Sequence, residues 1–391
     1  MPLFDARWNL VLAASLLAAC AADSPRAIAV ERADSVGIEI VRNLGPDAPI
    51  TWTFTPIFAL GGEDEGVESF YQLNDRSVAT DADGNLYVLD NGNHRVLVFD
   101  AEGTHLRTMG REGGGPGEFQ FFPTGIAVGV DGTVHVYDWG KRGIVRFAAD
   151  GTPLTTRRIE FHLEGGRWAL RGPEVLLETP AGTLSEGLVR LIVLGEAEDT
   201  ATLATFKRAP YKPVNYGRVQ LSGQLPLFSP SLAWTAADSL VFVSATAAYR
   251  IDVYRGRRLA TSIRRDVSPR PASRELAIRE VGEGITISSF GGGGGTCTVP
   301  PEKVVDERGV ADVLPAIRDI AVAPDGTAWV RHFAVKGEPA PIDVFSPDGA
   351  YRGTLPAGSP FPVAFFPDGR IIAIEKDELD VPRVVVYHVE T

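Results

Sequence analysis

Six short turn signals, each followed by a run of apolar residues, recur along this chain. The turns are Asp83-Gly84, Asp131-Gly132, Gly172-Pro173, Ala237-Asp238, Asp325-Gly326 and Asp368-Gly369. The runs after them, such as Leu86–Leu89 and Ile371–Ile374, have the length and composition of short buried strands. A turn followed by a strand, repeated along a whole chain, is typical of a β-propeller. We therefore predict an all-β fold, a six-bladed β-propeller.

The bulk composition limits the classes of partner. The chain has 391 residues and a formal net charge of −12. A binding site for nucleic acid needs clustered Lys and Arg against the phosphates, so this charge argues against such a partner. The length would usually indicate more than one domain, but in repeat folds each unit packs only on its neighbours. We expect one propeller, and a monomer.

The N-terminus differs from the rest of the chain. Arg7 is followed by the apolar run Leu10–Leu17 and then by Ala18, Ala19 and Cys20. A short apolar stretch that ends at small residues is typical of a secretory signal. The Leu-Ala-Ala-Cys ending resembles a bacterial lipobox, which implies cleavage before Cys20 and lipidation of that cysteine. The alternative is a plain signal peptide with a chance cysteine.

These observations divide the chain into three parts. We expect a lipoprotein signal peptide over residues 1–19, a tether over 20–35 and the propeller over 36–391. No later apolar run is long enough to cross a bilayer, so contact with the membrane would be through the lipid anchor alone. The expected location is the bacterial cell envelope, on the periplasmic or outer-membrane side.

The sixth predicted blade lacks one strand. The segment Gly61–Phe70 has the same Gly-to-Phe spacing as Gly110–Phe119, which links the first blade to the second. Trp52–Leu60 therefore stands where the outer strand of a preceding blade belongs. We predict that it completes the sixth blade and closes the ring, with Gly37–Arg42 as a further edge strand. On this interpretation residues 21–50 are dispensable.

One stretch of the first blade carries a more specific resemblance. Asp90–Asp100, followed by Gly103, resembles the core of an NHL repeat, as does the Gly-rich linker ending in Phe119 with Pro123 beyond it. With the lipobox, the chain resembles the six-bladed propeller lipoproteins of bacteria of the NHL-repeat type. The motif is clear in the first two blades, whereas the later blades keep mainly the turns.

Two insertions interrupt the repeat, one over 207–230 and one over 265–315. The first is basic and aromatic, and the second should hold two helices, near Ala272–Val281 and from Pro300 onward, separated by Gly291–Gly295. In a propeller, both would lie on the face that carries the blade connectors and the mouth of the central channel.

Equivalent positions in the six blades suggest a site at that mouth. They are Asp90, Asp138, Thr179, Ser244, His332 and Glu375. Three carboxylates and a histidine could bind a hard cation such as Ca²⁺, or supply a general acid and base. Alternatively, the two Asp side chains only cap the following turns, and the histidine has a structural partner. A register slip of one residue would replace His332 by Arg331.

The second blade adds two candidates on the same loop. Trp139 and Arg142 could contact an aromatic or anionic ligand. The chain has no Gly-x-Ser-x-Gly elbow and no His/Cys spacing typical of zinc. We expect Cys297 to be an ordinary loop thiol.

Two functions therefore remain. The first is a lipid-anchored binding or scaffold module for a protein, peptide or glycan at the channel mouth. The second is a metal-dependent enzyme at the same mouth, which the resemblance in fold to propeller lactonases and peptidyl-amide lyases implies. Fold alone is weak support for an activity, and no strong catalytic motif is present. The sequence favours binding.

Overall fold

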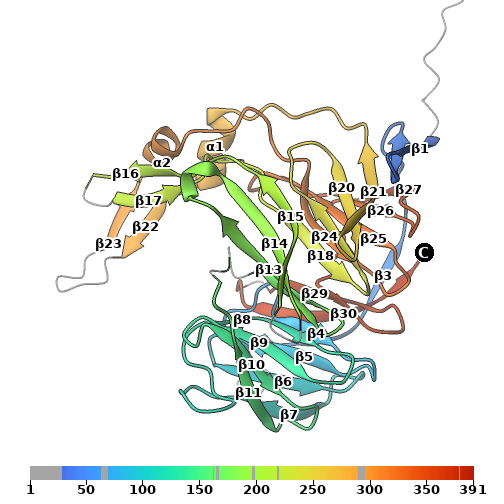
Figure 1. Ribbon diagram of the computed structural model, residues 1–391, viewed down its shortest axis with the longest axis vertical. Coiled ribbons are helices and arrows are strands. Elements are labelled where there is room, and N and C mark those ends of the chain that lie inside the picture. The colour runs from blue at the N-terminus through green and yellow to red at the C-terminus, as the bar shows by residue number, and fades with distance from the viewer. Residues whose placement is uncertain are drawn as a thin grey trace, which may run out of the picture.

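A computed structural model of the chain describes residues 29–62, 69–161, 163, 167–195, 199–217, 220–288, 296–377 and 379–391. Its strands form six radially arranged sheets, which confirms the predicted six-bladed propeller (Figure 1). The predicted signal peptide over 1–19, the lipidation site Cys20 and the Gly291–Gly295 run lie outside the described residues. No helix in the described part of the chain is long and apolar enough to cross a membrane.

The first three blades are continuous in sequence. Blade 1 consists of β4 (Val78–Thr80), β5 (Leu86–Asp90), β6 (Arg95–Phe99) and β7 (His105–Met109). Blade 2 consists of β8 (Pro123–Val128), β9 (Val134–Asp138), β10 (Gly143–Phe147) and β11 (Pro153–Arg158). Blade 3 consists of β12 (Trp168–Arg171), β13 (Glu174–Ala181), β14 (Leu188–Leu194) and β15 (Thr200–Lys207).

The last three blades include strands from the N-terminus. Blade 4 contains β18 (Ala233–Ala237), β19 (Leu240–Ser244), β20 (Arg250–Arg255) and β21 (Arg258–Arg265). Blade 5 contains β24 (Ile317–Val322), β25 (Ala328–His332), β26 (Ile342–Phe345) and β27 (Tyr351–Leu355). Blade 6 contains β28 (Ala364–Phe365), β29 (Ile371–Lys376), β30 (Pro382–Glu390) and, from the N-terminus, β3 (Thr53–Leu60).

The core lies between the blades. All five residues of β5 are buried, because the second strand of a blade has a neighbouring blade on each side. Leu86 and Val88 pack toward blade 6, and Tyr87 and Leu89 pack toward blade 2. The outer strand β7, in contrast, alternates between exposed and partly buried residues.

The ring closes where β3 pairs with β30. The two strands are antiparallel, in a register from Thr53 opposite Glu390 to Leu60 opposite Val384. The predicted closure by Trp52–Leu60 is therefore confirmed. Without β3, the ladder edge of β30 would be left unpaired.

The segment before β3 corrects the expected tether. Residues 29–35, which the sequence places in the tether, form β1 (Ala29–Ser35), antiparallel to β2 (Ile38–Leu44). The predicted edge strand exists as β2, but it joins blade 4 rather than blade 6, running parallel to β21. The periodicity of the blades gives no signal for this added pair, since none of the other blades has one among the described residues.

Residues 38–60 together form an N-terminal strap that crosses three blades. It begins on β21 of blade 4, and Pro49 bridges to Thr354 on the outer strand of blade 5 before β3 enters blade 6. The Asn43 side chain is buried and donates to Arg264 O (3.3 Å) and Gly349 O (3.0 Å). Its Oδ1 accepts from Tyr351 N at 2.7 Å. Residues 38–50 therefore connect blades 4 and 5, and these contacts argue against the predicted tolerance of a deletion of residues 21–50.

The two insertions fold into one unit, which we call the insertion unit. It contains β16 (Lys212–Asn215), β17 (Gln220–Gln224), α1 (Arg274–Val281), β22 (Ile285–Ser288), β23 (Thr296–Val299) and α2 (Pro301–Arg308). Both helices were predicted, whereas the hairpins were not. The unit projects from one side of the ring in Figure 1 and has cores of its own, to which both insertions contribute. Cys297 is exposed and lies in β23, not in a loop.

We expect the replacement of Asn43 by Ala to lower the free energy of unfolding by about 1–3 kcal/mol, because it leaves buried backbone groups of two blades without partners. The neighbouring Arg42 is exposed, so Arg42→Ala should change stability by less than about 0.5 kcal/mol. Urea unfolding of the two variants measures the difference. Equal effects would contradict a stapling role for Asn43.

Candidate functional site

Ion pairs cross the central channel at the connector face. Arg331 of blade 5 binds Asp75, which precedes the first strand of blade 1, with Nη2 3.1 Å from Oδ2. It also binds Asp319 of its own blade at 2.7 Å, and Arg167 of blade 3 lies 3.6 Å from the other oxygen of Asp319. Blades 1, 3 and 5 are not neighbours in the ring, so these contacts span the channel. The mouth is filled by paired charges.

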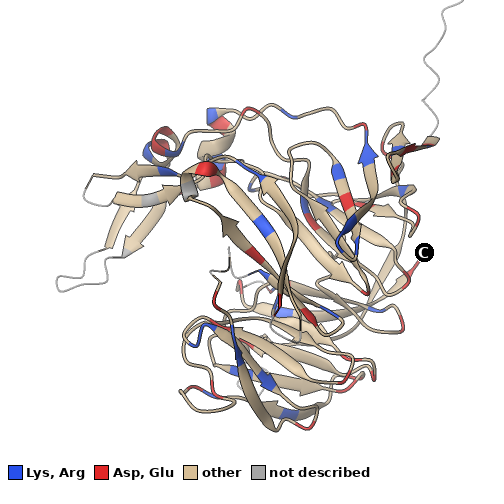
Figure 2. Cartoon of the chain, viewed as in Figure 1, with Lys and Arg blue, Asp and Glu red and all other residues tan. Residues whose placement is uncertain are grey.

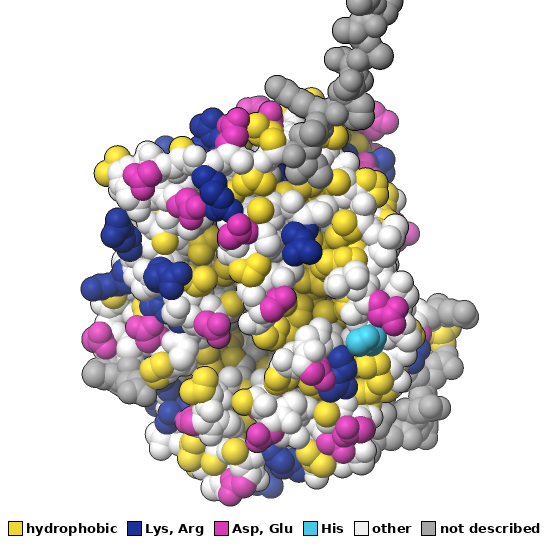
Figure 3. Space-filling view, turned by 90° about the vertical axis from the view of Figure 1, so that its right-hand side faces the viewer, with side chains coloured by type: hydrophobic (Ala, Val, Ile, Leu, Met, Phe, Trp, Pro, Cys, Tyr) yellow, Lys and Arg dark blue, Asp and Glu magenta, His cyan; other side chains and the backbone are white. Residues whose placement is uncertain are grey.

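The pKa directions agree with a crowded cationic mouth. Burial opposes the charged form of Arg331, but the carboxylates of Asp319 and Asp75 outweigh it and raise the pKa of this guanidinium. Burial and repulsion from Arg167 lower the pKa of Arg76, the next residue after Asp75. Arg331 is therefore held by one carboxylate of its own blade, Asp319, and by one from blade 1, Asp75. On the outer surface in Figure 3, acidic and basic side chains are interspersed.

The predicted site residue Asp90 is fully buried and its carboxylate is engaged. Oδ1 accepts from the backbone N–H of Tyr71 at 2.8 Å, and Oδ2 accepts from Asn93 Nδ2 (2.8 Å) and Arg95 Nε (2.9 Å). The side chain lies on the face of β5 that packs toward blade 6. Asp90 thus fastens the connector entering blade 1 to the loop between β5 and β6.

Asp138 plays the same part in blade 2. It is also fully buried, and its carboxylate accepts from the backbone N–H groups of Gln120 (2.6 Å), Lys141 (2.9 Å) and Phe121 (3.4 Å). The contact with Lys141 caps the loop after β9, and the contacts with Gln120 and Phe121 hold the connector. Arg142 on that loop is exposed and has φ +48°.

His332 lies in a buried polar cluster between blades 4 and 5. Its Nε2 is 2.9 Å from Asp343 Oδ2, outside hydrogen-bond geometry, and its ring contacts Tyr249 edge-on. Asp343 is fully buried and binds Arg265 Nη1 at 2.6 Å. Arg265 in turn binds Asp47 of the strap at 2.6 Å. Burial opposes ionisation of Asp343, yet His332 and Arg265 hold the pKa of this carboxyl below its usual range.

The other three equivalent positions along the repeat are separate from Asp90, Asp138 and His332. Glu375 accepts from Tyr387 OH at 2.6 Å, and burial with this carboxylate raises the pKa of Tyr387. Thr179 and Ser244 are buried. The structure therefore does not bring the predicted acids and His332 into one group. Among the residues that it describes, no three His, Cys, Asp or Glu side chains are placed to hold a metal ion.

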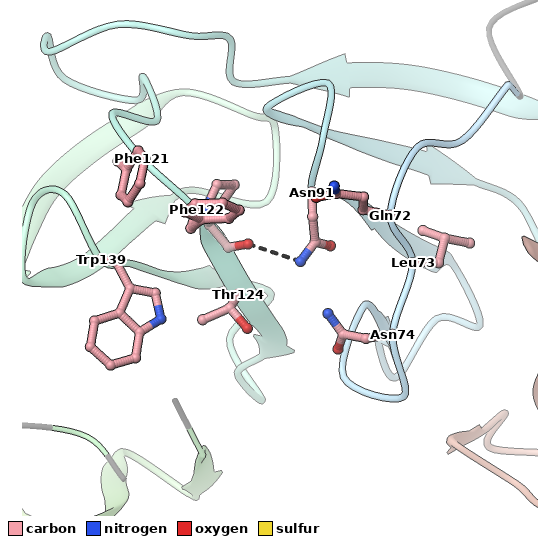
Figure 4. Close-up of a pocket in the computed structure, with 9 residues that line it drawn as sticks. Gln72, Leu73, Asn74, Asn91, Phe121, Phe122, Thr124 and Trp139 are labelled. Carbon is pink, nitrogen blue, oxygen red and sulfur yellow. Dashed lines mark hydrogen bonds between the residues drawn. The ribbon is translucent and has the colours of Figure 1, made fainter. Parts of the chain in front are cut away.

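A pocket of about 570 Å³ lies beside the channel, over blades 1 and 2 (Figure 4). It is bounded by the connectors entering both blades and by the loops after β5 and β9. The lining residues are Gln72, Leu73, Asn74, Asn91, Phe121, Phe122, Pro123, Thr124 and Trp139. Of the predicted site residues, only Trp139 lines it directly. Asp138 reaches it indirectly, by holding the Phe121 backbone.

Three aromatic residues in or next to this pocket are exposed, and the backbones of two of them are fixed. Tyr71, Phe121 and Phe122 keep 60%, 58% and 53% of their surface exposed. Tyr71 O accepts from Gly92 N at 2.8 Å, and Phe121 O accepts from Gly140 N at 3.1 Å. Each glycine is needed, since a Cβ on Gly92 would lie 2.0 Å from the Tyr71 ring and one on Gly140 2.8 Å from Phe121 Cβ. We call Tyr71, Phe121, Phe122 and Trp139 the aromatic rim.

The residue after each held aromatic is in the left-handed region. Gln72 has φ +64° and Phe122 has φ +47°. An aromatic residue with positive φ is strained by roughly 1–3 kcal/mol, and such strain clusters at functional sites. A search of the sequence for titratable groups does not point to these residues. The adjacent pair Phe121-Phe122 in a Gly-rich connector was the available signal.

Comparisons with known proteins agree with this architecture. A family model, DUF5128, described as a 6-bladed beta-propeller, matches residues 73–165, which hold blades 1 and 2. A Bacteroides fragilis NCTC 9343 protein predicted to be exported is 13% identical, with a TM-score of 0.53, and the match covers 90% of this chain and 100% of that one. A DUF4221 member from Bacteroides vulgatus ATCC 8482 is 10% identical, also with a TM-score of 0.53, over 87% and 99% of the two chains. No curated protein matches the sequence significantly.

These likenesses show the fold. The chain is a six-bladed β-propeller, and one of the structures it resembles is that of a protein predicted to be exported. Identities this low carry no activity from those proteins to this one. The resemblance to the NHL-repeat type stays a prediction.

We expect Phe122→Gly to leave the free energy of unfolding unchanged or to raise it by up to about 1 kcal/mol, because glycine removes the strain at φ +47°. Phe121, which is similarly exposed, is not among the positive-φ residues, so Phe121→Gly should lower stability by about 1 kcal/mol. Thermal and urea unfolding of both variants test this. A clear loss of stability in Phe122→Gly would mean that Phe122 is retained for packing.

Proposed function

We propose that this protein is an exported binding module that takes an apolar side chain of a polypeptide partner into the pocket beside its channel mouth. The observation that carries the proposal is the aromatic rim, in which Tyr71, Phe121 and Phe122 are exposed and Trp139 is half-buried. Buried carboxylates and close-packed glycines fix the backbones of Tyr71 and Phe121. A rigid, exposed aromatic side chain loses little conformational entropy on binding. Tyr and Trp are also enriched among the residues that dominate binding energy.

The pocket chemistry favours a peptide chain over a metal-bound substrate. Phe121, Phe122 and Trp139 form one side, and the amide side chains of Gln72 and Asn74 lie across from them in Figure 4. Gln72 is exposed, and its amide has no hydrogen-bond partner among the described residues. Such an amide can donate to and accept from a peptide backbone. A glycan could use the same groups, so it is the competing outcome.

The same geometry gives less support to a metal-dependent enzyme. It depended on Asp90, Asp138, His332 and Glu375 acting together, and each has a separate partner. A carboxylate that already accepts two or three N–H bonds is poorly placed to bind Ca²⁺ as well. Binding at the rim should therefore need no metal.

The test is selection of binders from a random displayed peptide library, with a glycan array beside it. Selected peptides should carry an aromatic or large aliphatic residue and should bind Trp139→Ala at least about tenfold more weakly than the native protein. Leu106→Ala is the matched control, since Leu106 is exposed on the outer strand of blade 1. Affinity should survive EDTA.

Three results would count against the proposal. Peptides that bind Trp139→Ala as tightly as the native protein would place the site elsewhere. Binding of glycans but not of peptides would mean that the partner is a glycan and not a polypeptide. Affinity that disappears with EDTA and returns with Ca²⁺ would favour the metal-dependent function.

We also propose that the module is lipid-anchored through Cys20 in the bacterial cell envelope, on the resemblance of Leu17–Cys20 to a lipobox. Several acyl chains on one residue give a durable anchor, because each buried CH₂ contributes about 0.8 kcal/mol. Cys20→Ser should move the protein from the membrane fraction to the soluble extracytoplasmic fraction. An unchanged distribution would leave a plain signal peptide as the explanation.

A further inference from the structure

We propose that a cleft between blades 2 and 3 binds a small organic anion, with a phosphate or carboxylate group on an apolar body. The cleft has a volume of about 1000 Å³. It opens beside the first hairpin turns of the two blades, at Val130–Thr133 and Gly172-Pro173. It is therefore on the face opposite the aromatic rim and independent of the function proposed above.

The cleft exists because the side chains between blades 2 and 3 change from apolar to polar along the strands. Tyr137 and Ile144 of blade 2 pack with Val175 and Ile192 of blade 3 in one buried core cluster. Toward the hairpin turns, the same faces of β9 and β10 carry His135 and Arg146 instead. Side chains two residues apart on a strand share a face, so these polar groups point where core residues would otherwise stand.

Three arginines line the cleft in a chain of net charge −12. Arg146 donates through Nε to Thr155 O at 3.0 Å, and within the described residues its terminal N–H groups have no partner. Arg157 Nη2 donates to Gly195 O of blade 3 at 2.5 Å and so bridges the two blades. Arg158 is exposed at the edge. Basic segments are visible on the strands of this lower part of the molecule in Figure 2.

His135 places a buried ring nitrogen without a hydrogen-bond partner in the described part of the cleft. Its Nδ1 is buried and has no hydrogen-bond partner among the described residues. Burial and repulsion from Arg146 lower the pKa of His135 to about 4, although Asp131 acts in the other direction. A buried polar atom without a partner is costly, and an anion would supply both the acceptor and the missing charge.

The other lining groups define the kind of anion. Asp131 is already bound to the N–H and hydroxyl of Thr133, at 3.0 and 2.9 Å, and Glu160 is exposed at the edge. Leu170, Leu194 and Pro173 give the blade 3 side an apolar wall. A bare inorganic ion would leave this wall in contact with water. A volume at the upper end of small-molecule sites instead suits an anionic head attached to an apolar ring or chain.

The probe is phenyl phosphate, and its binding is measured by calorimetry and by NMR titration of the His135 ring. We expect saturable binding, an upward shift of the His135 pKa from about 4 in its presence, and at least about tenfold weaker binding to Arg146→Gln. Arg352→Gln is the matched control, because it removes the same charge from an exposed position on blade 5. The melting temperature of Arg146→Gln without ligand checks that the variant folds.

Each remaining outcome overturns the proposal. Absence of binding excludes the site, and an equal loss in Arg352→Gln means non-specific attraction. Equal binding of neutral phenol means an apolar cavity only. Binding of phosphatidylglycerol vesicles in place of the soluble probe would mean that the anion is a lipid headgroup. A site between two blades is not expected to reach a headgroup in a membrane.

Discussion

The stability of this ring depends on how its two ends are joined. A propeller blade packs only on its neighbours, so an open ring would expose one face of each terminal blade and the edge of β30. Here β3 closes the last blade, and the strap before it also fastens blades 4 and 5 through Asn43, Asp47 and Pro49. Closure is thus spread over half of the ring. The buried Arg265–Asp343 pair, which reaches the strap through Asp47, belongs to the same fastening.

Paired charges occupy the channel mouth, and the proposed binding pocket lies beside it. Because Arg331, Asp75 and Asp319 bind one another across the channel, its centre is occupied by side chains of the protein itself. The accessible pocket is displaced to the rim over blades 1 and 2, where the connectors carry exposed aromatic residues. Asp90 and Asp138 contribute there through the backbone that they hold, not through direct contact with a ligand.

The sequence revealed the repeat and the closing strand, because turn signals and the spacing Gly61–Phe70 are local patterns. It could not reveal the strap, since β2 pairs parallel to a strand more than two hundred residues away and no other blade has such a pair. Four of the equivalent positions after the turns, Asp90, Asp138, Ser244 and His332, are the last residues of their strands. The side chains of Asp90 and Asp138, however, are fully buried and bind the backbone of the connectors. Phe122 was missed for a related reason, since its positive φ depends on tertiary contacts.

The place where the strap joins the ring also determines which side of the propeller carries the N-terminal strands. The described chain starts at β1 on the outer edge of blade 4, and in a ring of six blades the one facing it across the axis is blade 1 (Figure 1). The aromatic rim begins on blade 1. The proposed lipid attachment and the proposed recognition site would therefore lie on opposite sides of the ring. A surface that holds the N-terminus would leave the rim facing outward, and the protein would work as a spacer as well as a receptor.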